Sequence, residues 1–190
     1  MVRQPSINAR HRTPLSTERI IEAALRIVDG QGLARLTMRR LGDALEVEAM
    51  AIYHHLPRGK EQLLDCLVDH VASSPAAADG ASPSTWRDVL RAWAGDYRER
   101  LLAHAGVVPL LVTRRNPAAL TTTVASLQEV LRRGGVPEDK AAAAAHTLLG
   151  YVIGHVALEA RGTREDGADR TVDWDARFAS GLGIILGGIT

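Results

Sequence analysis

The sequence predicts an all-α protein that divides into a small N-terminal three-helix head and a larger helical body. Apolar residues recur at spacings of three and four along most of the chain, as they do on the buried face of an amphipathic helix. Glycine and proline separate these stretches, and strand-like alternation does not rise above noise. Hydrophobic residues make up 46% of the sequence, which is enough to bury a core.

The head is predicted over residues 16–72, after a basic and proline-containing stretch, residues 1–15, that we expect to be a flexible arm. Its expected elements are a helix from Ser16 or Thr17 to Gly30, short helices at Met38–Leu45 and about Glu48–His55, and a longer amphipathic helix through Val71. Ser16 or Thr17 should cap the first helix, and Thr37 the second, because a side-chain oxygen can accept a backbone N–H there.

A small, polar, proline-containing stretch from Ser73 to Ser84 is the expected hinge to the body, residues 84–190. The body should contain a helix from Trp86, helices near 118–133 and 138–161, a loop over 162–172 and a last helix from about Asp173. The final segment, Gly181 to Ile189, is apolar and rich in glycine, so we expect it to be buried against a partner.

Composition and motifs argue against several classes of protein. No stretch approaches the roughly 18 uninterrupted apolar residues of a membrane span, and residues 1–12 lack the apolar core of a secretion signal. The lone Cys66 cannot form an internal disulfide, so we expect a cytoplasmic protein without membrane association. The common catalytic motifs and phosphate-binding glycine loops are absent, which disfavours an enzyme.

Charge and local pattern together point to DNA. Residues 1–60 carry ten basic and six acidic side chains, whereas the remainder is slightly acidic. Short helices separated by tight turns are the layout of a helix-turn-helix, although structural three-helix bundles share it. If Ile52 and Leu56 turn inward, the helix presents Ala49, Met50, Tyr53 and His54. Arg39 and Arg40 on the preceding helix, and Lys60 at the start of the next, could reach bases or phosphates.

The head resembles the N-terminal domain of the TetR family of repressors from Ser16 to Val71. The resemblance rests on the opening helix with its glycine turn, then LTMRRLGDAL, then AIYHHLPRGKEQLL, in that order and at family spacing. It continues more weakly through WRDVLRAWAGDYRERLLAHAGVVPLLVTR, GYVIGHVALE and RFASGLGIILGGI, which look like the regulatory domain of the tetracycline-repressor branch. The resemblance implies a helix-turn-helix head followed by a ligand-binding and dimerisation domain.

Carried over position by position, the resemblance implies DNA-contacting residues on two helices and at the start of a third. These residues are Thr37, Met38 and Arg39, then Ala49, Met50, Ala51, Tyr53, His54 and His55, and finally Lys60, the phosphate-contacting lysine. The turn departs from the family because Glu46 stands where glycine is usual. Either Glu46 adopts a strained left-handed conformation, or the turn has a different geometry.

A family-like body implies a ligand cavity between Trp86 and Glu159, with a few polar groups over an apolar wall. The polar candidates are His104, Thr113, Arg114, Gln128, His146, Tyr151, His155 and Glu159, and the wall includes Trp93, Leu110, Leu111 and Leu148. A lone histidine is more often a structural group than a ligand. His155 and Glu159, four residues apart, could share a metal or bond to each other, and we favour the bond.

Tetracycline is a doubtful ligand for this chain. In the tetracycline-repressor branch a histidine beside the LVTR-like stretch binds the drug's magnesium, and Leu110 stands at the matching position. Glu159 and Thr113 match other positions of that site, but these two alone do not make a magnesium site. We therefore expect a small organic ligand, with no metal and no cofactor.

The resemblance also implies that the last two long helices build a homodimer. Two heads would then face successive major grooves and read a near-palindromic operator. The sequence thus predicts a ligand-responsive repressor that a small organic inducer releases from double-stranded DNA. Two other roles stay open, a helical adaptor that has lost DNA binding and an activator.

Overall fold

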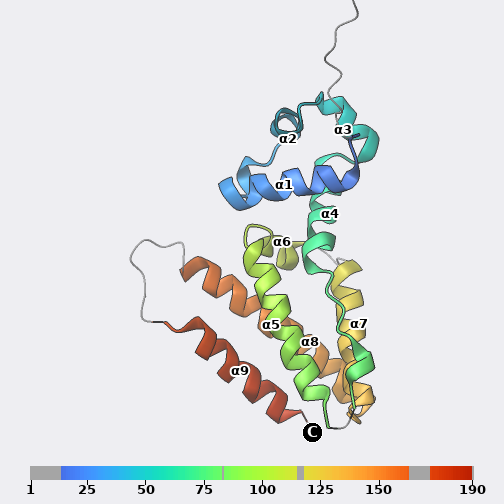
Figure 1. Cartoon of the computed structure of the whole chain (residues 1–190), viewed down its shortest axis with the longest axis vertical. Coiled ribbons are helices and arrows are strands. Elements are labelled where there is room, and N and C mark those ends of the chain that lie inside the picture. Colours follow the sequence, from blue (N-terminus) through green and yellow to red (C-terminus); the bar gives the residue numbers. More distant parts are fainter. Residues whose placement is uncertain (1–13, 83, 115–117, 163–171, 190) are drawn as a thin grey trace, which may run out of the picture.

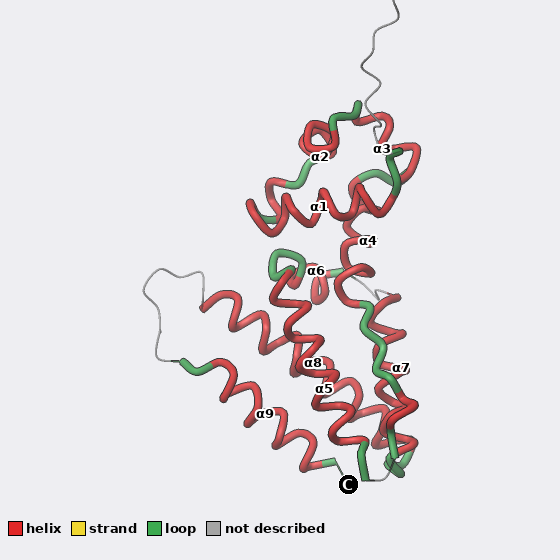
Figure 2. The backbone as a smooth tube through the Cα atoms, viewed as in Figure 1, coloured by secondary structure: helices red, strands yellow, loops and turns green. Residues whose placement is uncertain are grey.

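The computed structural model describes residues 14–82, 84–114, 118–162 and 172–189, and all regular structure within them is helical, as predicted (Figure 2). The head contains α1 (Thr17–Gln31), α2 (Met38–Leu45) and α3 (Ala49–His55), and α4 (Lys60–Ala72) joins it to the body. The body contains α5 (Trp86–Ala103), α6 (Val108–Thr113), α7 (Ala118–Arg133), α8 (Glu138–Gly162) and α9 (Trp174–Gly188) (Figure 1). Short 3-10 helices span Leu33–Arg35 and Ala78–Gly80. The predicted arm up to residue 13, and residues 163–171 of the predicted loop, lie outside the described residues.

Local sequence explains where the helices of the head begin and end. Ser16 Oγ accepts from the backbone N–H of Arg19 at 3.3 Å, and Thr37 Oγ1 accepts from that of Arg40 at 3.1 Å, so both predicted caps form. Gly32 ends α1 with φ of 83°, a conformation that glycine adopts without a side-chain clash. Asp173 caps α9 by accepting from Ala176 at 2.8 Å, so the last helix begins one residue later than predicted.

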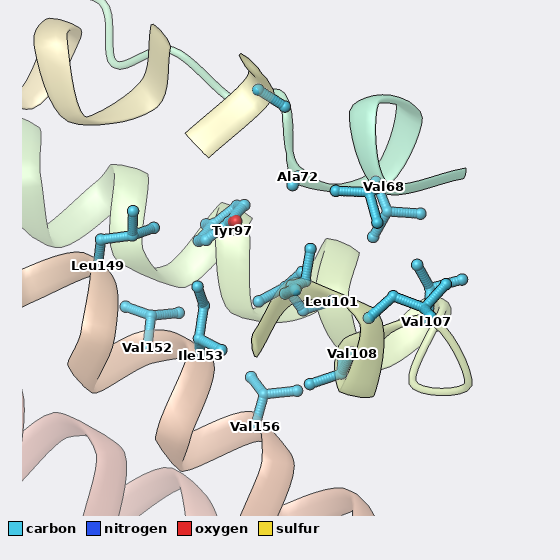
Figure 3. Packing of buried hydrophobic residues seen from close by; sticks show 14 of the residues in the cluster. Val68, Ala72, Tyr97, Leu101, Val107, Val108, Leu149, Val152, Ile153 and Val156 are labelled. Atoms are coloured by element: carbon cyan, nitrogen blue, oxygen red, sulfur yellow. The ribbon is translucent and has the colours of Figure 1, made fainter. Parts of the chain in front are cut away.

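Helix α4 connects the two parts by packing into both. It contacts α1 in the head and α5, α6 and α7 in the body. Figure 3 shows Val68 and Ala72 of α4 facing the same buried cluster as Leu101 of α5, Val108 of α6 and Val156 of α8. Because a packed helix is stiff, a shift of the body around α4 is transmitted toward the head.

The predicted hinge is held against the body by specific bonds. The backbone N–H of Ser74 donates to Thr123 Oγ1 at 3.3 Å, and that of Ala76 donates to Ser126 Oγ at 2.9 Å, so this stretch follows α7 (Figure 2). Trp93 Nε1 donates to the carbonyl of Ser74 at 2.6 Å. The small, polar composition that predicts a linker here serves close packing along α7.

Two helices of the body, α6 and α8, need an explanation beyond the sequence pattern. Helix α6 was not predicted, but Pro109 lies in its first turn, where a missing N–H costs nothing. Helix α8 is long and apolar enough, by length and composition, to cross a membrane, since an 18-residue window within it has a mean hydropathy of 1.4. It contacts α5, α6, α7 and α9, which bury one side of the helix in the core.

The hydroxyl of Tyr97 is buried without a hydrogen-bond partner among the described residues. Figure 3 shows the ring between Ala72 of α4 and the side chains of Leu149 and Ile153 of α8. Burial raises the pKa of this phenol well above its usual range, because an apolar environment disfavours the charged form. An unpaired buried hydroxyl costs stability.

Tyr97→Phe should therefore raise the free energy of unfolding by about 1 kcal/mol, since it removes a polar atom that bonds to nothing. Tyr151→Phe is the matched control, because the Tyr151 hydroxyl donates to the carbonyl of Phe178 at 2.8 Å. That control should lower stability by about 1 kcal/mol. Urea unfolding followed by circular dichroism measures both variants, and a loss of stability in Tyr97→Phe contradicts the assignment.

Candidate DNA interface and effector cavity

Helices α2 and α3 are joined by a turn that is tight enough to need particular residues. Glu46 closes α2 in the left-handed conformation, with φ of 56° and ψ of 41°, so the strained alternative is the correct one. The backbone N–H of Val47 then donates to the carbonyl of Gly42 at 3.0 Å. A Cβ on Gly42 would lie 2.8 Å from the carbonyl oxygen of Val47, so only glycine permits this approach.

The outward face of α3 carries the side chains that the sequence singled out. Ile52 and the following Leu56 are fully buried and fix the helix against the head. Met50 is 68% exposed and Tyr53 38% exposed. His54 and His55 are exposed, while Ala49 and Ala51 are half-buried. The face therefore carries small side chains near its start and polar or polarisable side chains along its length, as a helix entering a major groove requires.

Three basic side chains flank this face, and none of them is paired with an acidic side chain among the described residues. Arg39 and Arg40 are exposed on α2, and Lys60 begins α4 immediately after Gly59, where φ is 59°. Within the described residues, none of these three cations forms an ion pair, so each is available to a phosphate. Thr37 is exposed at the start of α2 and Met38 is half-buried beside it. These groups lie at the end of the molecule farthest from the C-terminus (Figure 1).

A second candidate site is a cavity of about 550 Å³ between α6, α7 and α8. Its apolar lining is Leu111, Leu120, Val124, Ala125 and Leu149, and its polar lining is Arg114, Thr121, Gln128 and His146. The volume is that of a small-molecule site, and the mixture of lining groups is typical of one. Of the predicted ligand residues, the cavity brings together Gln128 and His146, together with Arg114 and Leu111.

The other predicted ligand residues lie elsewhere. His104 Nδ1 bonds to Asp29 Oδ2 at 2.9 Å, where the body meets α1, and Thr113 donates to the carbonyl of Pro109 at 2.9 Å. Trp93, Leu110 and Leu148 are buried. Tyr151, His155 and Glu159 belong to a cluster between α8 and α9 that contains Trp174 and Phe178. The structure therefore distributes the predicted ligand residues over several places.

The predicted hydrogen bond between His155 and Glu159 does not form, although the two side chains lie within ion-pair distance. His155 Nε2 lies 3.7 Å from Glu159 Oε2 and has no hydrogen-bond partner among the described residues. Arg98 takes the carboxylate instead, with Nε and Nη2 at 2.9 and 2.7 Å from its two oxygens. Burial lowers the pKa of His155, and the nearby Glu159 opposes that shift. Within the described residues, no three metal-ligating side chains are grouped.

The comparisons with known proteins agree with this geometry. Residues 20–67 match the model of bacterial regulatory proteins of the tetR family, and residues 79–172 match that of a tetracycline repressor-like C-terminal domain. An HTH-type transcriptional regulator from Saccharopolyspora erythraea is 30% identical over 168 residues, which cover 87% of this chain and 70% of that protein. The chain belongs to the tetR family. It is a DNA-binding transcriptional regulator, and the family assignment confirms that it is not an enzyme.

Two solved structures have the same fold as this chain over nearly its whole length. ActR from Streptomyces coelicolor in complex with actinorhodin has a TM-score of 0.76 and 25% identity, over 93% of this chain and 97% of that chain. BioQ with its double-stranded DNA operator has a TM-score of 0.71 and 28% identity, over 93% of this chain and 98% of that one. One relative was therefore solved with a small molecule and the other with DNA.

Sequence reasoning missed two ion-pair clusters in this tetR-family regulator: Arg98 was not singled out at all, and Arg114 was named only as a polar group of the ligand cavity. Arg98 holds Glu159, and its Nη1 also lies 2.7 Å from Asp175 of α9. Arg114 holds Asp65 and Glu61 of α4. Each arginine is separated from its acids by many residues, so spacing along the chain gave no indication. The turn glycine Gly42 was also missed, although its place before an acid-containing turn could have suggested a close backbone approach.

Gly42→Ala should weaken DNA binding at least tenfold and lower stability by about 1–3 kcal/mol, because the added methyl group meets backbone and the turn must shift. Gly30→Ala near the end of α1 is the control, since a Cβ there meets nothing within 4 Å. That variant should bind DNA normally and gain about 0.5–1 kcal/mol. Fluorescence anisotropy with duplex DNA and thermal unfolding measure both. Unimpaired binding by Gly42→Ala would contradict the turn geometry.

Proposed function

We propose that this protein is a homodimeric repressor that binds a near-palindromic operator through two copies of the head and is released by a small organic molecule. The observation that carries the proposal is the uncompensated cationic face formed by Arg39, Arg40 and Lys60 around the exposed side of α3. A cytoplasmic location follows from binding to DNA. Neither a metal nor a cofactor is part of the mechanism.

The DNA contacts divide into two kinds. Lys60 and the threonine at the start of α2 meet phosphates, which fixes the position of the head on the duplex. Met50, Tyr53 and His54 reach base edges in the major groove, where a methionine can contact a thymine methyl group. Arg39 and Arg40 reach bases or backbone beside them. The fully buried Ile52 and Leu56 support this face, because they hold α3 at a fixed depth.

The dimer surface is the outer side of α8 and α9, which run next to each other at one side of the body (Figure 1). Its exposed residues are small or apolar at helical spacing, namely Ala143, Thr147, Gly150, Gly154 and Leu158 on α8, and Ala176, Ala179, Gly183, Ile184 and Gly187 on α9. A Cβ on any of these four glycines would meet nothing within 4 Å in its own chain. The absence of side chains at these positions would therefore allow the helices of a second copy to pack closely against α8 and α9.

The effector occupies the cavity between α6, α7 and α8. Helix α6 contacts α4, and α4 leads directly back to the recognition helix. An effector that binds better when the two heads are spaced wrongly for successive grooves, about 34–36 Å apart, lowers the affinity for DNA by population shift. The ActR complex with actinorhodin and the BioQ complex with DNA support a mechanism of this kind.

Lys60→Ala should weaken binding to all duplexes similarly and flatten the dependence of log affinity on log salt by about one unit per lost phosphate contact. Lys140→Ala, at the start of α8 and far from the head, is the control and should change neither quantity. Anisotropy titrations at several salt concentrations measure both variants. An unchanged salt slope in Lys60→Ala would remove Lys60 from the interface.

Ile184→Lys should shift the protein from dimer to monomer, because it places a desolvated charge opposite its own copy at a two-fold interface. Ile184 is 77% exposed in the single chain, so the fold should survive. Ala92→Lys on the exposed side of α5 adds the same charge and should stay dimeric. Sedimentation velocity gives the masses. A dimeric Ile184→Lys protein contradicts the proposed surface.

The most informative experiment selects duplexes bound by the wild-type protein from a random pool. The proposal expects an enriched near-palindrome whose half-sites are about one helical turn apart. Reporter expression from a promoter carrying that sequence should fall when the protein is present and recover with effector. Failure to enrich any sequence at low salt, or enrichment of a single unrepeated half-site, would refute the proposed function.

A further inference from the structure

We propose that the effector of this protein is an apolar carboxylic acid, and that its carboxylate binds the two N–H groups of Arg114 Nη1 in the cavity between α6, α7 and α8. The inference rests on the proposed function, because it specifies the chemistry of that effector cavity.

Two nitrogens of the Arg114 guanidinium are engaged by α4, and the third, Nη1, is available. Its Nε donates to Asp65 Oδ1 at 2.8 Å, and its Nη2 lies 2.6 Å from the same oxygen and 3.1 Å from Glu61 Oε2. Nη1 has no partner among the described residues, although the side chain lines the cavity and is only 20% exposed. A guanidinium presents five N–H donors, and Asp65 and Glu61 occupy the three on Nε and Nη2, so the two on Nη1 remain for a carboxylate.

The remainder of the cavity sets the character of the ligand. Leu111, Leu120, Val124 and Leu149 form an apolar wall next to Arg114, which fits a hydrocarbon or ring body. In the polar part of the lining, His146 Nδ1 donates to the carbonyl of Ala142 at 2.9 Å. In this tautomer Nε2 can act as an acceptor, and Gln128 offers both an acceptor and a donor. One anionic group, an apolar body and a hydroxyl or amide match these features.

The position of Arg114 explains how such a ligand would act on the head. Glu61 and Asp65 both lie in α4, within its first two turns, and Asp65 also bonds Arg58 Nη2 at 3.2 Å. A ligand carboxylate would be a third anion on one guanidinium, close to two carboxylates that already share it. Repulsion between like charges in a partly desolvated site then loosens α4 from Arg114. Because α4 follows the recognition helix, the effector and DNA would weaken each other's binding reciprocally.

The test uses benzoate, 2-naphthoate and octanoate, each paired with its neutral primary amide. Calorimetry on the full-length wild-type protein should show at least one carboxylate binding ten or more times more tightly than its amide. Arg114→Gln should abolish this preference, and Arg114→Lys should reduce it, because an ammonium lacks the separate pair of N–H groups that Nη1 provides. Glu61→Gln should strengthen carboxylate binding several-fold, since it removes a competing anion from Nη2. Circular dichroism melts check that each variant is folded.

Anisotropy with the selected duplex then measures release. The carboxylate that binds should lower DNA affinity at least tenfold in the wild type and less in Glu61→Gln, whereas its amide should not. Equal binding of carboxylates and amides, no carboxylate binding up to millimolar concentration, or an unchanged preference in folded Arg114→Lys overturns the inference while leaving DNA binding intact. A wild-type protein that binds no duplex refutes the proposed function, and in that case the calorimetric preference still decides the ligand chemistry.

Discussion

Helix α4 packs against the head and the body at once, within one continuous hydrophobic cluster, and this sharing governs how the head can respond to the body. Its buried residues, among them Leu63, Leu67 and Val71, pack on α1 at one side and on the body helices at the other. The helix spans about 20 Å at a rise of 1.5 Å per residue. It is short and well packed, so a force that the body applies to it moves the helix as a whole rather than bending it.

Elements that depend on neighbouring residues could be predicted from the sequence. The caps at Ser16 and Thr37 and the inward placement of Ile52 and Leu56 all follow from spacings of three or four. The left-handed Glu46 was foreseen as one of two alternatives, because the length of the turn limits its geometry. What the sequence could not reveal was which distant side chains meet. Arg98 and Glu159 are 61 residues apart, so no helical spacing along the sequence indicates that they meet.

The candidate effector site was harder to predict than the DNA interface for the same reason. A recognition helix is a single short segment, so its outward face can be read from one helical period. A cavity is assembled from three helices, and whether Gln128 and His146 face each other depends on how α7 and α8 are rotated. Those rotations are set by the core, through residues such as Leu127 and Leu148, which are fully buried. The prediction therefore combined Gln128 and His146, which line the cavity, with groups such as His104 and His155 that lie elsewhere.

Two further contacts limit how the head can move relative to the body. Val28 of α1 packs so closely on Gly106 that a Cβ there would lie 2.6 Å from Val28 Cγ1, and the neighbouring Asp29 bonds to His104. Together with Arg114 on α4, these contacts hold the head at two separate points. A head fixed at two points cannot pivot freely on one of them, so a small displacement of α6 is transmitted as a rotation of the whole head. In a dimer, such a rotation changes the separation of the two recognition helices. The affinity for DNA depends on that separation, because it must match the spacing of successive major grooves.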